Sequence, residues 1–404
     1  MYLKYFDKFL NMKPYLSIEE EEWEYIKETF DKQDVKESLA KVAMTYEIPY
    51  AEISENDAYN DLKRLKGMRH NEILVEGEWF AREGTQYRYD LTFEGKQQYF
   101  RRINSGNDAS NYFQQKNRWS VDGSVSPGPK RTWENEKFMT SLMGAAYTLK
   151  LPKINRSVLR TMIGLRKYIC SQFKPNVAKV LYDKLGSKSI LDFSAGWGDR
   201  LAGFYGSETG EFYLGIDPRK ENHPIYEEQK QFYDKHRTMF EVDKKSMFIE
   251  YPAEDFEYKE NMYDTVFTSP PYFSVERYSY DDTQSWVRYK DIDDWNKDFL
   301  QKTLKKLWPS IKSDGYLCVN ISDVYASVKS TKSWLEICNP MNDFLSTFTD
   351  SEYQGCIGME MAKRPNSGGA GTAKSLDYTD ESLQKTLDTQ DKRFCEPIWI
   401  WKKI

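Results

Sequence analysis

A chain of 404 residues exceeds what a single hydrophobic core usually organises, so we expect two domains or one large domain with an extension. Hydrophobic residues make up 39% of the chain and aromatic residues 15%, which excludes disorder along its whole length. The formal net charge of -5 argues against a protein that coats nucleic acid through its overall charge, and leaves room only for a local basic face.

The cysteines and histidines indicate whether the protein binds a metal and which cellular environment it occupies. The five cysteines form no CxxC pair, and the three histidines add no Cys/His spacing typical of zinc, so we expect no metal site. The odd cysteine count fits a reducing cytoplasm. No apolar run approaches the roughly 18 to 20 residues of a membrane span, and the first residues lack a signal-peptide core. These features predict a soluble, cytoplasmic protein with no membrane partner.

The first 75 residues or so are expected to be helical. Ser17 is placed to cap a helix over 18–30, in which Trp23, Ile26 and Phe30 recur at helical spacing. Short alternating segments follow between about 76 and 103. The run 84–93, with a turn at 94–96, predicts a β-hairpin.

Basic and aromatic residues interleave between the hairpin and residue 131. Arg101 and Arg102 follow an aromatic pair, and Lys130 and Arg131 follow a Pro/Gly turn. In a DNA-contacting surface, arginines bind phosphates and rings stack on bases, so these four residues are candidate DNA contacts. An ordinary surface of a tyrosine-rich protein accounts for the same pattern, and both interpretations stay open.

The hydrophobic pattern changes near residue 150. Helices are expected over 134–150 and 155–170, and after them strands alternate with helices in the manner of a parallel sheet with crossover connections. We therefore predict an N-terminal α+β domain over 1–150 and an α/β domain over 151–404. A glycine-rich stretch over 366–372 is expected to be a flexible loop.

Polar residues follow three successive predicted strands of the second domain. The strand 189–192 runs into a Gly-x-Gly turn at Gly196 and Gly198, where a ligand can approach the backbone closely. The next strand ends at Asp217, a candidate for binding ribose hydroxyls or, alternatively, a helix cap. Glu254 and Asp255 add an acidic pair suited to an adenine amino group. Because ligands bind at the carboxyl edge of open α/β sheets, the three positions together favour a nucleoside site.

The most specific string of the chain follows the strand 263–267. It comprises Thr268, Ser269, Pro270, Pro271, Tyr272 and Phe273. Two prolines end a strand and hold a rigid, outward carbonyl. The Ser269 hydroxyl and the Pro270 carbonyl are interpreted as acceptors for an exocyclic amine, whose lone pair is otherwise delocalised into its ring. Tyr272 is expected to stack on a base taken out of the duplex. Phe273 is a candidate opposite wall, and Tyr278 a candidate lining of the pocket.

This succession resembles class I S-adenosylmethionine-dependent methyltransferases, specifically the amino-methylating DNA methyltransferases. The resemblance spans about 170–404 and implies a Rossmann-like domain with a mostly parallel seven-stranded sheet and helices on both faces. It implies S-adenosylmethionine as cofactor, with its methionine part near Asp192, Ser194, Gly196 and Gly198, its ribose on Asp217 and its adenine on Glu254 or Asp255. Phe173 and Lys174 look like the upstream motif that encloses its amino-acid end. Stretches 314–323 and 396–403 resemble the strands that complete the sheet.

The resemblance further implies site-specific methylation of a flipped-out cytosine at N4 or adenine at N6 in DNA, as in restriction-modification, in a prokaryotic or phage-infected cytoplasm. The serine form of the string slightly favours cytosine. Two alternatives stay open: an amino-methyltransferase of RNA or of a protein glutamine, and a non-catalytic DNA-binding protein that keeps the fold. Asp323, at the end of 314–323, is expected to have a structural role such as capping a helix.

Overall fold

The computed structural model describes residues 2–81, 85–124, 126–239, 241–328, 331–361 and 393–404, so the predicted loop at 366–372 lies outside the described residues. The chain forms two compact units that are interleaved in the sequence. Unit 1 contains residues 1–53, 114–171 and 276–279, and unit 2 contains residues 54–113, 172–275 and 280–404. The two units therefore do not correspond to two continuous segments that meet near residue 150. The assignment of recognition to one domain and catalysis to the other stays a prediction.

Unit 1 is mainly helical and has its own core. Its elements are η1 (Lys4–Phe9), β1 (Ser17–Ile18), α1 (Glu20–Thr29), α2 (Lys32–Ala43), β5 (Asp122–Gly123), α6 (Pro129–Trp133), α7 (Glu136–Thr148), β6 (Ile154–Asn155), α8 (Arg156–Arg166) and β11 (Glu276–Arg277). Helix α5 (Asn107–Arg118) contains the boundary between the units. Trp23 and Ile26 of α1 pack with Leu159 and Met162 of α8 in one hydrophobic cluster. The helices expected near 134–150 and 155–170 are thereby confirmed as α7 and α8.

The expected cap of the first helix is wrong. Ser17 lies in β1, where it pairs with Asn155 of β6, and α1 begins only at Glu20. The Ser17 hydroxyl donates to Glu19 at 2.7 Å instead of binding a helix amide. Pairing with a strand more than 130 residues away thus replaced the local cap that the sequence suggested.

Unit 2 is built around a large sheet. In the described part of the chain this sheet has ten strands, in the order β2-β4-β15-β16-β12-β10-β7-β8-β9, with β3 paired to β16. Strands β9, β8, β7, β10 and β12 run parallel, and β16 enters antiparallel between β12 and β15. The strands are β2 (Leu74–Glu76), β3 (Trp79–Phe80), β4 (Gln98–Phe100), β7 (Ser189–Asp192), β8 (Phe212–Ile216), β9 (Lys245–Ile249), β10 (Tyr263–Thr268), β12 (Ile311–Asn320), β15 (Ser351–Glu360) and β16 (Arg393–Lys403). The predicted α/β fold class is confirmed, and three short strands that precede β7 (β2, β3 and β4) extend the seven expected strands to ten.

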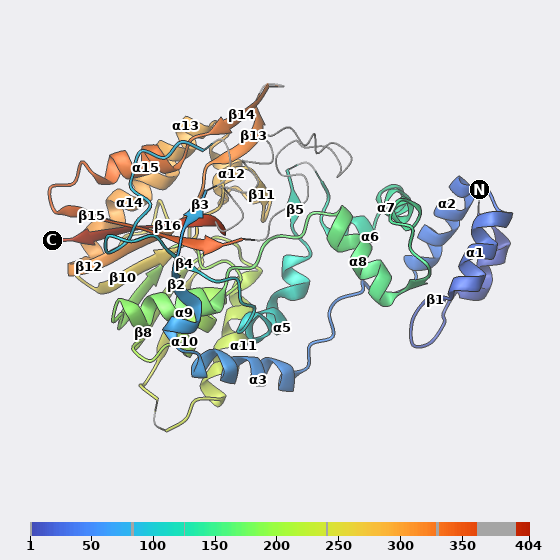
Figure 1. Ribbon diagram of the computed structural model, residues 1–404, viewed down its shortest axis with the longest axis horizontal. Coiled ribbons are helices and arrows are strands. Elements are labelled where there is room, and N and C mark those ends of the chain that lie inside the picture. Colours follow the sequence, from blue (N-terminus) through green and yellow to red (C-terminus); the bar gives the residue numbers. More distant parts are fainter. Residues whose placement is uncertain (1, 82–84, 125, 240, 329–330, 362–392) are drawn as a thin grey trace. The chain divides into compact units, whose positions relative to one another are not determined.

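Helices cover both faces of this sheet (Figure 1). Adjacent residues of one strand serve opposite layers, as Ile190 and Leu191 do in β7. One layer contains α3 (Glu55–Gly67), α4 (His70–Ile73), α9 (Pro175–Lys184), α10 (Asp199–Gly206) and α11 (Asn222–Lys235). The other contains the π-helix η2 (Trp295–Gln301), α14 (Lys302–Leu307) and α15 (Cys338–Leu345). Shorter elements are α12 (Ser285–Arg288), α13 (Ile292–Asp294), η3 (Trp308–Ser310), β13 (Val324–Val328) and β14 (Thr331–Leu335). Both faces are therefore buried, which fits the apolar strands.

The hairpin predicted over 84–96 is only partly present. Residues 85–92 form no strand, and the antiparallel pair is β2 with β4. The alternation of the segment has another cause, because Tyr87 and Tyr89 pack on the core while its backbone binds α15 and β15. The Asn339 side chain accepts from the Arg88 amide at 3.0 Å, and Tyr353 donates to the Asp90 carbonyl at 2.6 Å.

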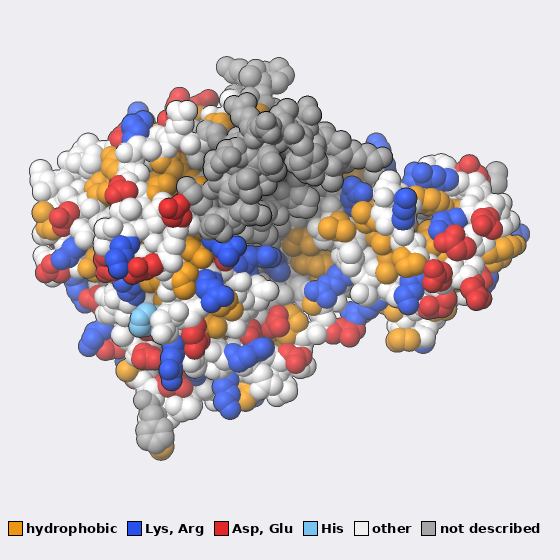
Figure 2. Space-filling model, in the orientation of Figure 1, with side chains coloured by type: hydrophobic (Ala, Val, Ile, Leu, Met, Phe, Trp, Pro, Cys, Tyr) orange, Lys and Arg blue, Asp and Glu red, His pale blue; other side chains and the backbone are white. Residues whose placement is uncertain are grey.

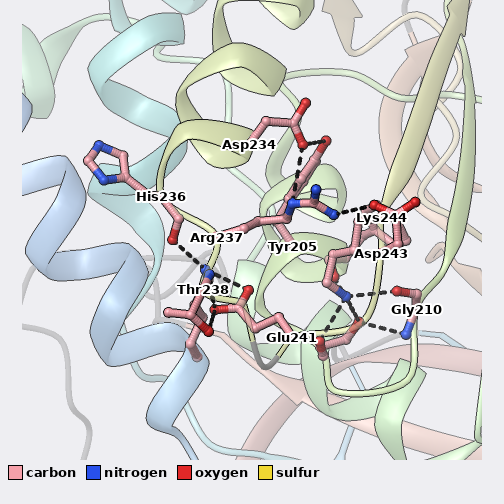
Figure 3. Close-up of polar contacts among 12 residues, drawn as sticks. Tyr205, Gly210, Asp234, His236, Arg237, Thr238, Glu241, Asp243 and Lys244 are labelled. Atoms are coloured by element: carbon pink, nitrogen blue, oxygen red, sulfur yellow. Dashed lines mark hydrogen bonds and ion pairs between the residues drawn. The ribbon is translucent and has the colours of Figure 1, made fainter.

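A buried lysine closes the connection between α11 and β9 (Figure 3). The Lys244 ammonium donates to the carbonyls of Ser207 at 2.9 Å and Gly210 at 2.8 Å. It thus sits at the C-terminal end of α10, where the helix dipole favours a cation. Burial lowers the pKa of Lys244 to about 8. Among the described residues, no helix has the length and apolar character needed to cross a membrane.

Candidate active site

The glycine-rich turn after β7 requires its glycines. Gly196 and Gly198 have φ angles of +60° and +70°, in the left-handed region that disfavours side chains. A Cβ on Gly198 would lie 2.5 Å from the Gln229 side-chain oxygen. The turn therefore passes directly against α11, and α10 begins immediately after it.

Contacts from neighbouring elements fix this turn. The Gly196 amide donates to Asp217 at 2.8 Å, and the Gly196 carbonyl accepts from Asn222 at 2.9 Å and from the Tyr226 hydroxyl at 2.5 Å. Ser194 and Gly196 remain partly exposed while the residues beside them are buried. The turn thus offers a small, partly exposed surface in a fixed position.

Asp192, at the end of β7, is enclosed by its own neighbours. Its carboxylate accepts from the Arg200 guanidinium at 2.7 Å, from the Tyr213 hydroxyl at 2.7 Å and from the Thr268 hydroxyl at 3.1 Å. Asp192 and Arg200 are both buried. The carboxylate therefore joins the glycine-rich turn to β10, and its contacts are internal to the protein.

Asp217, at the end of β8, keeps acceptor capacity. One of its oxygens accepts from the Gly196 amide, and the other accepts from the Arg219 amide at 2.9 Å. A carboxylate has about four acceptor positions, so two remain for a ligand. Asp217 is 8% exposed. Burial raises its pKa, and the two amides oppose that rise.

Glu254 and Asp255 differ in how their oxygens are engaged. Both Arg288 and the Tyr289 hydroxyl contact the Oε1 atom of Glu254. Asp255 binds Arg288 through one oxygen at 2.7 Å and Lys302 through the other at 2.9 Å. Burial raises the pKa of Glu254, whereas for Asp255 the hydrogen bonds from Lys302 and Arg288 outweigh burial and lower the pKa. Of the two, Glu254 retains the oxygen that is not held by a cation.

Phe173 and Lys174, the two residues expected to enclose the cofactor, contact different parts of the protein. Phe173 packs edge-on against Phe267 of β10, with ring centroids 5.5 Å apart, and the Arg200 guanidinium lies 5.1 Å from its ring. Lys174 instead donates to Asn104 at 2.9 Å. Phe173 therefore joins the Asp192 cluster directly, while Lys174 is tied to the segment before α5.

A chain of hydrogen bonds sets the direction of the Ser269 hydroxyl. The Asn320 amide group donates to the Pro397 carbonyl at 3.1 Å, so its oxygen faces Ser269. The Ser269 hydroxyl donates to that oxygen at 3.2 Å. With its proton committed to Asn320, the Ser269 oxygen presents only lone pairs to anything else that binds there.

The rest of the Pro-Pro loop is a tight turn. The Phe273 amide donates to the Pro271 carbonyl at 3.1 Å, and Phe273 has a φ of +52°, which is costly for a residue with a side chain. Phe273 is buried and packs against Trp295 of the π-helix, at 6.2 Å between ring centroids. Within the described residues the Pro270 carbonyl accepts no hydrogen bond, so it is a free acceptor in the loop.

Tyr272 reaches the last strand. Its hydroxyl donates to Glu396 at 3.2 Å, and the ring is partly buried against the core. Glu396 and Pro397 are adjacent in β16, so the same strand supports Tyr272 directly and Ser269 through Asn320. The two acceptors and the aromatic ring are thereby held by the sheet.

The five predicted substrate contacts outside the loop are divided between the units. Arg101 and Arg102 follow β4 in unit 2 and are exposed. Lys130 and Arg131 lie in α6 of unit 1 and are exposed, with Arg131 paired to Asp122 at 2.9 Å. The Tyr278 hydroxyl donates to Glu276 within unit 1. Their roles as substrate contacts stay predictions.

Three residues of the site were not singled out from the sequence. Arg200 forms an ion pair with Asp192. Asn320 accepts a hydrogen bond from the Ser269 hydroxyl, and Glu396 accepts one from the Tyr272 hydroxyl. Asn320 carried a signal, because it is a polar residue at the end of a buried strand. Arg200 and Glu396 gain their meaning only from contacts across the fold. The predicted structural role of Asp323 is confirmed, since it accepts from the Ile337 and Cys338 amides where α15 begins.

No protein-family model and no curated protein matches the chain. Among solved structures, an S-adenosylmethionine-dependent methyltransferase from Methanosarcina mazei is 11% identical over 54% of this chain and 93% of its own, with a TM-score of 0.33. A tRNA methyltransferase from Aquifex aeolicus is 12% identical over 58% of this chain and 71% of its own, with a TM-score of 0.32. A methyltransferase from Mesorhizobium loti is 9% identical over 56% and 96%, with a TM-score of 0.26. Such similarities decide nothing about activity, and the fold rests on the strand order above.

Proposed function

We propose that the chain transfers a methyl group from S-adenosylmethionine to the exocyclic amino group of a base in DNA. The observation that carries the proposal is the orientation of Ser269. Its hydroxyl proton is committed to Asn320, so its oxygen and the Pro270 carbonyl are two acceptors at one strand end. An amine whose nitrogen lone pair must be freed needs acceptors for its hydrogens, and this pair supplies them.

The carboxyl edge of the sheet fits the cofactor. Ser194 and Gly196 are partly exposed beside α10, and Asp217 has acceptor positions left for two ribose hydroxyls. Glu254 has an oxygen for the adenine amino group. S-adenosylmethionine supplies an electrophilic methyl group carried on a cationic sulfur.

The catalytic loop acts by positioning. Ser269 and Pro270 accept hydrogen bonds from the amine, so that its lone pair turns toward the methyl carbon. Tyr272 presents a flat ring, held at its hydroxyl by Glu396, on which a flipped base stacks. The rate gain comes from orientation of the two reactants, with no covalent enzyme intermediate.

A transfer assay with labelled S-adenosylmethionine tests the proposal on the full chain. We expect duplex DNA to be labelled, and total RNA and a protein mixture to stay unlabelled in parallel reactions. Mass spectrometry of the digested DNA identifies N4-methylcytosine or N6-methyladenine. Label in RNA or protein but not in DNA would contradict the choice of substrate while retaining methyl transfer.

The Ser269→Ala substitution tests whether the Ser269 hydroxyl contributes to catalysis. Loss of a single positioned hydrogen-bonding group typically lowers kcat by about a hundredfold or more, and we expect a loss of that size. Ser274→Ala is the matched control, because Ser274 lies five residues later, is also partly exposed and has no side-chain hydrogen bond among the described residues. Equal activity of the two variants would remove Ser269 from the site.

A further inference from the structure

Helix α8 of unit 1 has one buried and one exposed face. Leu159, Met162 and Ile163 pack into the core of the unit. The exposed face carries Ser157, Arg160, Thr161, Gly164 and Leu165, which recur at positions i, i+3, i+4, i+7 and i+8. An eleven-residue helix is about 16 Å long. The face is therefore long enough to contact several base pairs.

Positive charge is concentrated around this helix. Residues 137–171 contain seven Lys and Arg and no Asp or Glu, in a chain whose net charge is -5. Within unit 1, residues 114–171 contain eleven basic and three acidic residues, whereas residues 1–53 contain seven basic and twelve acidic residues. On the face of this unit drawn in Figure 2, acidic side chains gather toward the end that carries α1. The charges of unit 1 are thus segregated by sign, as a polyanion-binding surface requires.

Several of these cations are not neutralised by the protein. Arg160 is exposed and has neither an ion pair nor a hydrogen bond from its side chain among the described residues, and the same holds for Lys137 and Lys150. By contrast, Arg156 pairs with Glu52, and Arg166 donates to Thr148 at 3.0 Å. The basic charge that remains available therefore includes the middle of the exposed face of α8.

Gly164 keeps this face thin. A Cβ at Gly164 would meet no atom within 4 Å, so packing within the protein does not require glycine there. Glycine inside a helix costs about 0.5–1 kcal/mol relative to alanine. A glycine on the exposed face lets another molecule approach the helix backbone closely. Gly164 thus complements the basic charge of Arg160 on the same face.

We propose that α8 is the DNA-reading helix and that its exposed face enters the major groove of duplex DNA. This inference rests on the proposed function in taking DNA as the substrate. The major groove of B-form DNA is about 12 Å wide and admits a helix, whereas the deep, narrow major groove of duplex RNA does not. Arg160 reads a guanine edge, Leu165 contacts a thymine methyl group, and Lys137 and Lys150 bind phosphates.

Fluorescence anisotropy with the full chain and a labelled random-sequence DNA duplex tests the helix without requiring catalysis. We expect Arg160→Gln and Lys150→Gln each to weaken binding about tenfold. Lys150→Gln, which removes a phosphate contact, should also reduce the slope of log affinity against log salt by about 1. Lys4→Gln is the matched control, since Lys4 is an exposed lysine in the acidic part of unit 1. It should leave both quantities unchanged.

A variant that adds bulk to α8 without changing its charge distinguishes insertion into the major groove from electrostatic attraction. Gly164→Gln adds bulk in open space and no charge, so we expect normal folding but at least tenfold weaker DNA binding. If wild-type protein and both Arg160→Gln and Gly164→Gln bind the duplex equally, α8 is not the reading helix, although the proposed function stands. If the wild-type protein binds duplex RNA as tightly as duplex DNA, the groove argument fails. If it binds no DNA at all, the proposed function itself fails.

Discussion

The carboxyl edge of the sheet in unit 2 and the exposed face of α8 in unit 1 use polar residues in opposite ways. At the sheet edge, buried groups such as Asp192, Arg200 and Asn320 each have designated partners within the protein. On α8, Arg160 is exposed and lacks such partners among the described residues. The first arrangement holds its atoms in place through internal contacts, and the second leaves charge free for another molecule. Burial with partners therefore suits positioning, and exposure without them suits recognition.

Breaking the buried ion pair should give the largest effect. Arg200→Met leaves the Asp192 charge buried without its cation, which typically costs about 3–5 kcal/mol of unfolding free energy. Chemical denaturation followed by fluorescence measures it. Arg160→Gln is the matched exposed arginine and should stay within about 0.5 kcal/mol of wild type. Similar losses in both variants would abolish the distinction between the two regions.

Removing the aromatic ring of the loop should come next. Tyr272→Ala is expected to lower kcat by about a hundredfold, roughly 2.7 kcal/mol, because a flipped base loses its stacking surface. Cofactor affinity, measured by calorimetry, should stay nearly unchanged. Tyr272→Phe keeps the ring and removes the hydroxyl that contacts Glu396, so it should retain most activity. Loss of cofactor binding in Tyr272→Ala would sink the stacking role.

Removing the carboxylate of Asp217 should have a smaller effect, and that effect should be on cofactor binding. Asp217→Ala is expected to weaken S-adenosylmethionine binding by about 1.5–3 kcal/mol, the range for hydrogen bonds to a charged group. Because burial raises the pKa of Asp217, wild-type affinity should fall on acidification at a pH above the ordinary range of an aspartate, as the carboxylate that accepts the ribose hydroxyls becomes protonated. Calorimetry across pH tests this, and Asp217→Asn should lack that step.

The smallest effect should come from removing one hydrogen-bond donor next to the loop. Asn320→Asp still accepts from Ser269 but cannot donate to the Pro397 carbonyl. We expect kcat to fall about tenfold, roughly 1.4 kcal/mol, with an unchanged KM for the cofactor. Asn339→Asp provides a control on a buried asparagine that bonds the Gln86 carbonyl away from the loop. A matching loss in that control would show a stability effect instead.

Local patterns predicted the strands and the residues at their ends. Gly196, Gly198 and Asp217 each follow a buried strand, and the contacts of Gly196 with Asp217 unite them at one edge as expected. The loop at Ser269 was found because two prolines have few local explanations. These features depend on neighbours in the sequence, which is why periodicity and turn chemistry reveal them.

Features that depend on distant partners escaped prediction. The β1 strand at Ser17 exists because β6 pairs with it, and residues 85–92 lack a strand because their alternating tyrosines pack on β15 and β16. The choice between Glu254 and Asp255 needed the positions of Arg288 and Lys302. Because the two units are interleaved in the sequence, the amino-acid composition did not reveal a linker between them. In each case a long-range contact overrode a local preference.

The interleaving also sets the order in which synthesis can complete the protein. Unit 1 needs no residue beyond Ser279, so its residues have all been made while β12, β15 and β16 are still missing. Strand β4 emerges early but pairs with β15, and β15 joins the sheet through β16. Until β16 leaves the ribosome, the nascent chain carries an open parallel sheet edge at β10 or β12, a surface prone to aggregation. A chain that stops before Arg393 would keep Ser269, Tyr272 and Asp217 and still lack the strand that orders its sheet.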